Sequence, residues 1–127
     1  FAGDPLDAVL DELGERVAAA LDMGIARERI VVDPGIGFGK RSEQSLRLLG
    51  CLERFSTWGC PVMIGASRKR FIGEITGVAD SHQRVHGSVG AAGAAYDRGA
   101  RIFPVHDVAA TRQALDVAAA IRQAGVA

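Results

Sequence analysis

Three clusters of polar residues carry the chemistry that this sequence could perform. Asp33 precedes the glycine-rich stretch 34–40, Arg68 and Lys69 belong to a local basic cluster, and His106 lies near the carboxyl end. A carboxylate can accept two donors from the amidine-like edge of a heterocycle, and arginine or lysine suits an anion or the acceptor atoms of such a ring. An imidazole titrates near neutral pH and can serve as an acid, a base or a phosphate donor.

Each cluster also has a purely structural interpretation, and the residues alone leave both open. Asp33 could cap a turn or pair with Lys40 or Arg41, and a basic triplet is usually a solvated loop. A lone histidine is more often structural than catalytic. His82 and His86, four residues apart, could in principle bind a metal, but the sequence shows no third ligand and we expect them at a surface or an interface.

The glycine-rich stretch matches neither common nucleotide-binding motif. A Walker A loop would need glycine and serine or threonine at the positions of Pro34 and Arg41. The dinucleotide fingerprint fails because Lys40 stands where its third glycine is required. The glycines still permit a close approach of the backbone to a flat ligand, and Phe38 could lie against one. Alternatively, they only form a tight turn.

Apolar spacing predicts helices that alternate with short strands. We expect helices near 5–24, from Ser42 with Leu46, Leu49, Leu52 and Phe55 on one face, at about 81–98, and from 108 onward, and strands at 30–32, 61–65 and 101–105. The strand at 30–32 has no polar alternation and is expected to be covered on both faces. The small residues of the helix at 81–98 predict tight packing that offsets the low helix propensity of Gly87, Gly90 and Gly93.

This order of elements predicts an α/β protein with a parallel sheet and helical crossovers. A doubly wound sheet and a (β/α)8 barrel both remain possible. A polar cluster follows each of the three strands, and a barrel gathers the carboxyl ends of its strands on one rim, where its active sites lie. Three strands are too few to close a barrel, so the remaining strands would have to come from elsewhere.

Composition describes an ordinary globular domain. The chain has 127 residues, of which 48% are apolar and 24% charged, with 15 basic and 15 acidic residues and no net charge. This excludes a disordered tail and a disulfide-rich miniprotein, and a neutral chain is an unfavourable partner for nucleic acid. We expect no membrane span, a cytoplasmic location, and reduced thiols at Cys51 and Cys60.

Three motifs resemble the dihydropteroate synthase family: Asp33-Pro34-Gly35-Ile36-Gly37-Phe38-Gly39-Lys40, Gly65-Ala66-Ser67-Arg68-Lys69 and Val105-His106-Asp107-Val108. The resemblance implies a pterin-binding (β/α)8 barrel. Residues 1–127 would supply its carboxyl-terminal half, with about the last three strands and four helices. The family joins 6-hydroxymethyl-7,8-dihydropterin diphosphate to p-aminobenzoate in folate biosynthesis, is a target of sulfonamides, and uses Mg²⁺, whose ligands would lie mainly in the other half.

The resemblance also implies a role for each matching residue. Asp33 would hold the amino-pyrimidine edge of the pterin, Lys69 would bond its ring acceptors, Ser67 would lie near the p-aminobenzoate carboxylate, and His106 would contact the diphosphate. Lys69 and His106 would be the catalytic residues, and none of these residues would bind a metal. The substrate-binding set comprises Asp33, Phe38, Gly65, Ser67, Arg68, Lys69 and His106, with Arg68 flanking the pterin. A homodimer through the helices at about 81–98 and 109–123 is also implied.

One position departs from the family pattern. Pro104 stands where the family has an arginine that would grip the diphosphate, and proline supplies neither charge nor a donor. Removing one donor of this kind costs on the order of 10² to 10³ in rate. Pro104 therefore leaves open a paralogue that binds pterin without synthase activity. A pterin-dependent methyltransferase that serves a corrinoid partner is a separate alternative, and the match at Ser67-Arg68-Lys69, which belongs to the synthases, disfavours it.

Overall fold

The computed structural model describes residues 4–126. It contains five α-helices, α1 (Pro5–Asp22), α2 (Ser42–Gly50), α3 (Arg70–Thr76), α4 (Val85–Asp97) and α5 (Val108–Ala124), and two strands, β1 (Val62–Met63) and β2 (Ala100–Ile102). Short 3-10 helices occupy Arg27–Arg29, Leu52–Ser56 and Ser81–Gln83. Within the described range no helix is both long and apolar enough to cross a membrane.

The strands form a small parallel sheet at the centre of the chain. β1 pairs with β2 in parallel, and Val32 forms a parallel bridge to Val62 on the other side of β1. Hydrogen bonds link the three segments, from Met63 N to Val32 O over 2.8 Å and from Ile64 N to Ile102 O over 2.9 Å. The predicted parallel order of strand segments joined by helices is confirmed, and parallel pairing brings their carboxyl ends to one edge.

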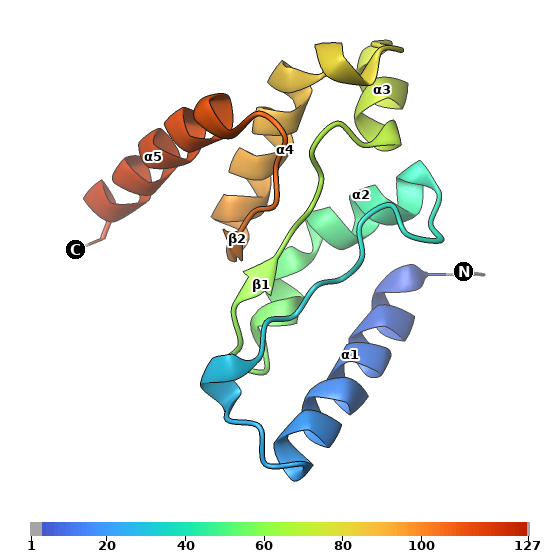
Figure 1. The fold of residues 1–127 in the computed structure, drawn as a ribbon, viewed down its shortest axis with the longest axis vertical. Helices are drawn as coiled ribbons and strands as arrows, with labels where there is room; N and C mark the ends of the chain where they lie inside the picture. The colour runs from blue at the N-terminus through green and yellow to red at the C-terminus, as the bar shows by residue number, and fades with distance from the viewer. Residues whose placement is uncertain (1–3, 127) are drawn as a thin grey trace.

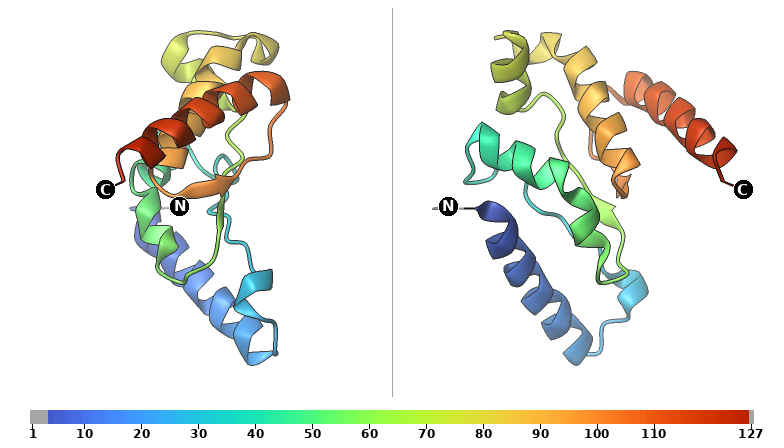
Figure 2. Two further views of the ribbon diagram at one scale, coloured as in Figure 1. Left: turned by 90° about the vertical axis from the view of Figure 1, so that its left-hand side faces the viewer. Right: turned by 180° about the vertical axis from the view of Figure 1, so that it is seen from behind.

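Helices cover one face of these strand segments. In Figure 1 the segments lie in front of α2 and α4, and the view from behind in Figure 2 shows the same helices in front. The most deeply buried apolar side chains of the described residues, each at most 1% exposed, form part of one core cluster and belong to Ile36, Leu48, Leu52, Phe55, Val62, Ile64, Ala95 and Ala100. Burial of this apolar surface is the main force that holds the helices on the sheet.

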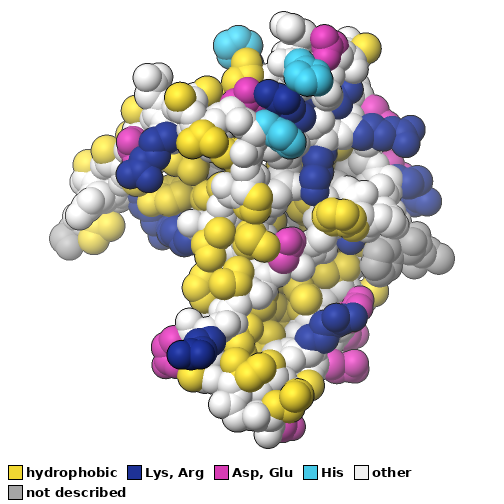
Figure 3. Space-filling view, viewed as in Figure 1, with side chains coloured by type: hydrophobic (Ala, Val, Ile, Leu, Met, Phe, Trp, Pro, Cys, Tyr) yellow, Lys and Arg dark blue, Asp and Glu magenta, His cyan; other side chains and the backbone are white. Residues whose placement is uncertain are grey.

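The opposite face of the strand segments is open, contrary to the expectation for 30–32. Val31 is 46% exposed while Val32 is buried, because successive side chains of an extended chain point to opposite faces. Hydrophobic side chains gather along this face in Figure 3. The prediction of a strand covered on both faces is therefore wrong for the described chain.

The second helix differs from the predicted one in its cap and in its buried face. Arg41, not Ser42, is the N-cap residue, and its backbone N–H donates to the Gln44 side chain over 2.8 Å. Leu46, predicted to face the core, is 40% exposed, whereas Leu48 is fully buried. The buried positions Ser45, Leu48, Leu52 and Phe55 recur at intervals of three and four residues, and Leu46 lies outside this series.

The predicted helix at 81–98 is two elements. The Asp80 carboxylate caps the 3-10 turn by accepting from the His82 backbone N–H over 3.0 Å, and α4 begins only at Val85. Close packing occurs at Gly87, where a Cβ would lie 2.4 Å from the Ile72 side chain on α3. Gly90 has open space around it, as does Gly93, so compensation by packing is confirmed at one of the three glycines.

Candidate functional site

Six of the seven predicted site residues meet around one cavity at the carboxyl ends of the strand segments. The cavity has a volume of about 370 Å³, and its walls are formed by Asp33, Phe38, Gly65, Ser67, Lys69, Pro104, Val105 and His106. Each of the three sequence clusters contributes to it, because the three parallel segments end side by side. Pro104 is among the lining residues, so the position that departs from the family pattern belongs to the site.

Ser67 holds His106 by two hydrogen bonds. The Ser67 Oγ lies 2.9 Å from His106 Nδ1, and the backbone N–H of His106 donates to the same oxygen over 3.1 Å. Ser67 is buried and His106 is exposed. The contact therefore fixes one nitrogen of the imidazole against the protein and turns the other edge of the ring outward.

Lys69 connects the basic cluster to the glycine-rich stretch. Its ammonium donates to the Ile36 carbonyl over 2.5 Å and lies 4.6 Å from the centre of the Phe38 ring, a cation–π arrangement. Burial lowers the pKa of Lys69 below its ordinary value, and the negative charge of Asp33 opposes that shift. A partly desolvated ammonium beside an exposed aromatic ring is a strong donor for acceptor atoms of a flat ligand.

The glycine-rich stretch forms a turn that presents Asp33 to the cavity. The Asp33 carboxylate accepts from the Gly35 backbone N–H over 2.8 Å, and the Gly37 N–H donates to Ser45 Oγ over 3.0 Å. Gly37 has a φ of +85°, which residues with a Cβ rarely adopt. A Cβ there would also lie 3.1 Å from Lys69 Cδ, so glycine permits the approach of Lys69.

Arg68 is the predicted site residue that does not line this cavity. Its guanidinium binds the Asp107 carboxylate through two hydrogen bonds of 2.9 and 3.2 Å, with both side chains largely shielded from solvent at 22% and 20% exposure. The pair lowers the pKa of Asp107 below its usual range. Arg68 thereby ties the second polar cluster to the third, and its flanking of a pterin stays a prediction.

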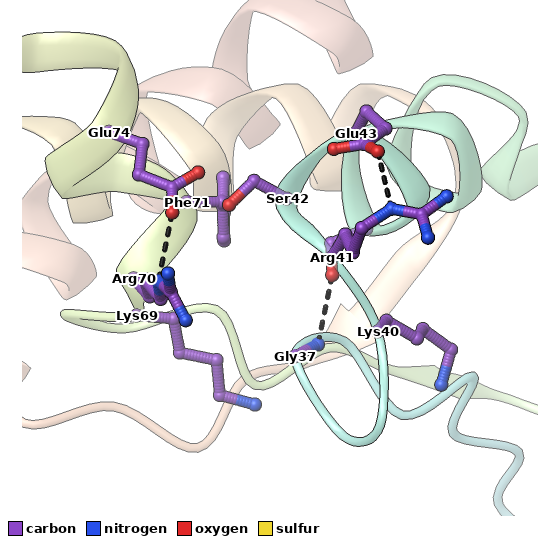
Figure 4. Close-up of a pocket in the computed structure, with 10 residues that line it drawn as sticks. Gly37, Lys40, Arg41, Ser42, Glu43, Lys69, Arg70, Phe71 and Glu74 are labelled. Carbon is purple, nitrogen blue, oxygen red and sulfur yellow. Dashed lines mark hydrogen bonds and ion pairs between the residues drawn. The ribbon is translucent and has the colours of Figure 1, made fainter. Parts of the chain in front are cut away.

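A second cavity meets the first at Lys69. It has a volume of about 330 Å³ and lies between the amino ends of α2 and α3 (Figure 4). The Arg41 side chain pairs with Glu43 over 2.6 Å and Arg70 with Glu74 over 2.8 Å. The lining residues are Gly37, Lys40, Arg41, Ser42, Glu43, Ser45, Lys69, Arg70, Phe71 and Glu74.

The described residues do not provide a set of metal ligands. Between residues 4 and 126 no three His, Cys, Asp or Glu side chains cluster so as to hold an ion. His82 lies beside Asp80, with a separation of 3.4 Å from Nδ1 to the carboxylate, and is exposed like His86. The described residues therefore offer no cluster of side chains that could hold the Mg²⁺, whose ligands are expected mainly outside this chain. Cys51 and Cys60 are free thiols.

Sequence reasoning missed two residues that shape the site from outside it. Arg84 and Ser88, four residues apart at the start of α4, both bond the backbone of Arg68. The i, i+4 spacing of two polar residues at the start of an otherwise small-residue helix was the available signal, since such residues share one face.

The fold and the site together define a parallel β/α protein of the barrel type with a polar cavity at the carboxyl ends of its strands. The chain belongs to the family of pterin-binding enzymes, whose model matches residues 1–106. A dihydropteroate synthase of Neisseria meningitidis is 47% identical over 90% of the chain, and an inactive dihydropteroate synthase 2 of Mycobacterium bovis is 38% identical over 92%. The chain spans 41% and 36% of these two relatives.

A solved structure shows the same architecture. Dihydropteroate synthase from Xanthomonas albilineans, in complex with 7,8-dihydropteroate, matches the whole chain with a TM-score of 0.93 and 45% sequence identity, and the chain covers 48% of it. The predicted fold class and the predicted pterin-binding family are therefore confirmed. The described helices and strands have the arrangement of part of a (β/α)8 barrel.

Proposed function

We propose that the protein containing this chain is a dihydropteroate synthase, a transferase that condenses 6-hydroxymethyl-7,8-dihydropterin diphosphate with p-aminobenzoate. The observation that carries the proposal is the single cavity in which Asp33, Lys69 and His106 meet at the strand ends. Support also comes from the similarity to a synthase that binds 7,8-dihydropteroate, a molecule that contains both the pterin and the aminobenzoate parts.

The cavity residues suit the two ends of the pterin substrate. The Asp33 carboxylate would accept the N–H donors of the amino-pyrimidine edge, and Lys69 would donate to the ring acceptors while Phe38 lies against the ring. His106, held by Ser67, would donate to the diphosphate. As the bond to the diphosphate breaks, negative charge moves onto the leaving group and positive charge onto the pterin, and His106 and Asp33 are placed to stabilise them.

The second cavity suits the other substrate. Lys69 stands where the two cavities meet, and Arg41 and Arg70 line the second one. Guanidinium groups bind carboxylates well, so p-aminobenzoate would lie with its carboxylate toward these arginines and its amino group toward the pterin. This placement replaces the expected one at Ser67, because Ser67 lines the first cavity and is bonded to His106. The partners of Arg41 and Arg70 in the free protein, Glu43 and Glu74, would then be displaced or shared.

The alternative is a paralogue that binds pterin and has lost the synthase activity. Pro104 lines the cavity at the position of the family arginine, next to His106. The similarity to a relative called inactive dihydropteroate synthase 2 makes this alternative specific. In that case the pterin contacts of Asp33 and Lys69 would persist, while stabilisation of the leaving diphosphate would be deficient.

Further parts of the proposal concern the whole protein. We infer that residues 1–127 are the carboxyl-terminal half of one barrel domain, whose remaining strands would cover the open face at Val31. A homodimer would form through α4 and α5, which pack against each other and leave Val108, Val117 and Ile121 exposed. Mg²⁺ would be held by residues outside this chain, and the location would be cytoplasmic.

The test uses the full-length protein and two measurements. Calorimetric titration with the dihydropterin diphosphate reports binding, and release of diphosphate with both substrates reports turnover, in the wild type and in Pro104→Arg. Pro61→Arg is the matched control, because Pro61 directly precedes β1 and so lies at the other end of the sheet from the cavity. Turnover in the wild type supports the synthase. Binding without turnover, with turnover gained in Pro104→Arg but not in Pro61→Arg, supports the inactive paralogue, and absence of binding overturns both.

A further inference from the structure

The turn between β1 and α3 has a strained backbone at its centre. Arg68 has a φ of +60°. Every other positive φ among the described residues belongs to a glycine. A side chain with a Cβ disfavours this left-handed conformation, so the surrounding structure must impose it. The neighbours on either side are the two residues that enter the cavity, Ser67 toward His106 and Lys69 toward Ile36.

The first turn of α4 holds both peptide groups of Arg68. The Arg68 backbone N–H donates to Ser88 Oγ over 2.9 Å, and the Arg68 carbonyl accepts from Arg84 Nη1 over 2.9 Å. The same nitrogen lies 3.5 Å from the Lys69 carbonyl. Ser88 is buried and Arg84 half-buried, so these bonds are largely protected from competition by water.

Arg84 also holds the loop that follows α3. Its Nε donates to the Val78 carbonyl and its Nη2 to the Ala79 carbonyl, each over 2.9 Å. All of these guanidinium bonds go to main-chain oxygens. A planar fork with five N–H groups can make them at once, whereas a lysine ammonium has three donors at one point.

The guanidinium of Arg84 packs against Gly73 on α3. A Cβ at Gly73 would lie 2.4 Å from Arg84 Nη2 and 2.6 Å from Cζ. Any larger residue would therefore push the guanidinium away from the carbonyls. The backbone of Gly73 lies inside a helix, where alanine is the better helix former, so packing against Arg84 accounts for the glycine.

We propose that Arg84 is a positioning residue of the site. With Ser88 it holds residues 67–69 in the left-handed turn that directs Ser67 onto His106 and Lys69 onto the glycine-rich stretch. Arg84 does not line the cavity, and its role is to fix Ser67 and Lys69, which do. The consequence for ligand binding rests on the proposed function, whereas the consequence for the turn does not.

The test compares Arg84→Ala, Arg84→Lys and Gly73→Ala with Arg101→Ala in the full-length protein. Arg101 is the matched control because its guanidinium also bonds main-chain carbonyls, those of Tyr96 and Ala100, far along the chain from the turn. Two readouts are used, hydrogen–deuterium exchange of residues 66–70 by mass spectrometry and calorimetric affinity for the dihydropterin diphosphate. Melting temperatures are measured alongside.

Faster exchange over residues 66–70 and an affinity about 10- to 100-fold weaker are expected for Arg84→Ala and Gly73→Ala, with partial recovery in Arg84→Lys and no change in Arg101→Ala. Gly73→Ala is decisive because it displaces the guanidinium while improving helix propensity, so a loss of affinity without a lower melting temperature cannot come from general instability.

Exchange and affinity at the wild-type level in Arg84→Ala and Gly73→Ala would overturn the proposal. If the wild-type protein binds no pterin, the proposed function fails and exchange alone decides: faster exchange supports the role of Arg84, and unchanged exchange overturns it.

Discussion

Ser67 and His106, thirty-nine positions apart in the chain, are joined by two hydrogen bonds that share a single hydroxyl oxygen. One bond fixes the backbone at the end of the third strand segment, and the other fixes the imidazole. The oxygen thus couples the loop after β1 to the loop after β2, which are neighbours because the two strands are parallel.

Ser67→Ala is expected to release the imidazole of His106 and leave its backbone N–H without this acceptor. Loss of one such buried bond costs about 1 kcal/mol of stability, and misplacement of a catalytic group by about 1 Å costs on the order of 100-fold in turnover. Diphosphate release and melting temperature measure the two effects. Ser56→Ala, at an exposed serine remote from the cavity, is the control. Equal turnover in both variants would contradict a role of Ser67 in holding His106.

Gly37→Ala is expected to impair the site more than Gly39→Ala does. Both glycines have positive φ values, +85° and +60°, so both substitutions carry a similar backbone cost of about 1–2 kcal/mol. Only at Gly37 would the new Cβ meet the Lys69 side chain, since Gly39 has nothing within 4 Å. Calorimetric pterin affinity should therefore fall much further in Gly37→Ala. Equal losses would show that backbone strain, and not contact with Lys69, decides the outcome.

Lys69 is expected to lose its charge at a lower pH than an ordinary lysine. Burial lowers its pKa from 10.5, so the ammonium is deprotonated before an exposed lysine would be. NMR of labelled lysine side chains follows the titration, with Lys69→Arg and Lys40→Arg used to assign the signals. Affinity for pterin should fall along the same titration in the wild type and stay level in Lys69→Arg, which keeps its charge. A pKa at or above 10.5 would contradict this prediction.

Asp107→Asn is expected to destabilise the protein in a manner that depends on pH. Arg68 lowers the pKa of Asp107 in the folded state, so the carboxylate's contribution is fully present above its unfolded pKa and is lost as the pH falls through the folded value. The difference in melting temperature from the wild type should be constant near neutrality and shrink below about pH 4. Asp116→Asn, which breaks the exposed pair with Arg112, should change little. A difference that does not depend on pH would exclude the ion pair as its cause.

Local patterns in the chain were sufficient to predict much of the architecture. Apolar spacing located the helices that became α1, α2, α4 and α5, because a buried helical face imposes a period that the sequence records. The position of a polar cluster after each strand segment predicted that Asp33, Lys69 and His106 would meet, and they line one cavity.

The burial of individual side chains, which depends on packing against residues distant in the chain, was predicted less well. Spacing alone put Leu46 in the core, but the neighbouring elements cover the face that carries Ser45, Leu48, Leu52 and Phe55, and Leu46 stays 40% exposed. Val31 was expected to be covered because its neighbours are apolar, yet composition does not say which face of a strand has a layer against it.

The sequence by itself determined the family, the alternation of helices and strands, and the residue types available to the site, since these follow from short motifs and from the period of the apolar residues. Only the tertiary structure decided how the available charges are distributed. It pairs Arg68 with Asp107, points Lys69 at the Ile36 carbonyl, and commits Arg84 to main-chain oxygens. Such choices depend on which groups come within about 3 Å of one another after folding, and a distance of that kind between residues 15 to 40 positions apart is a property of packing, which no local spacing records.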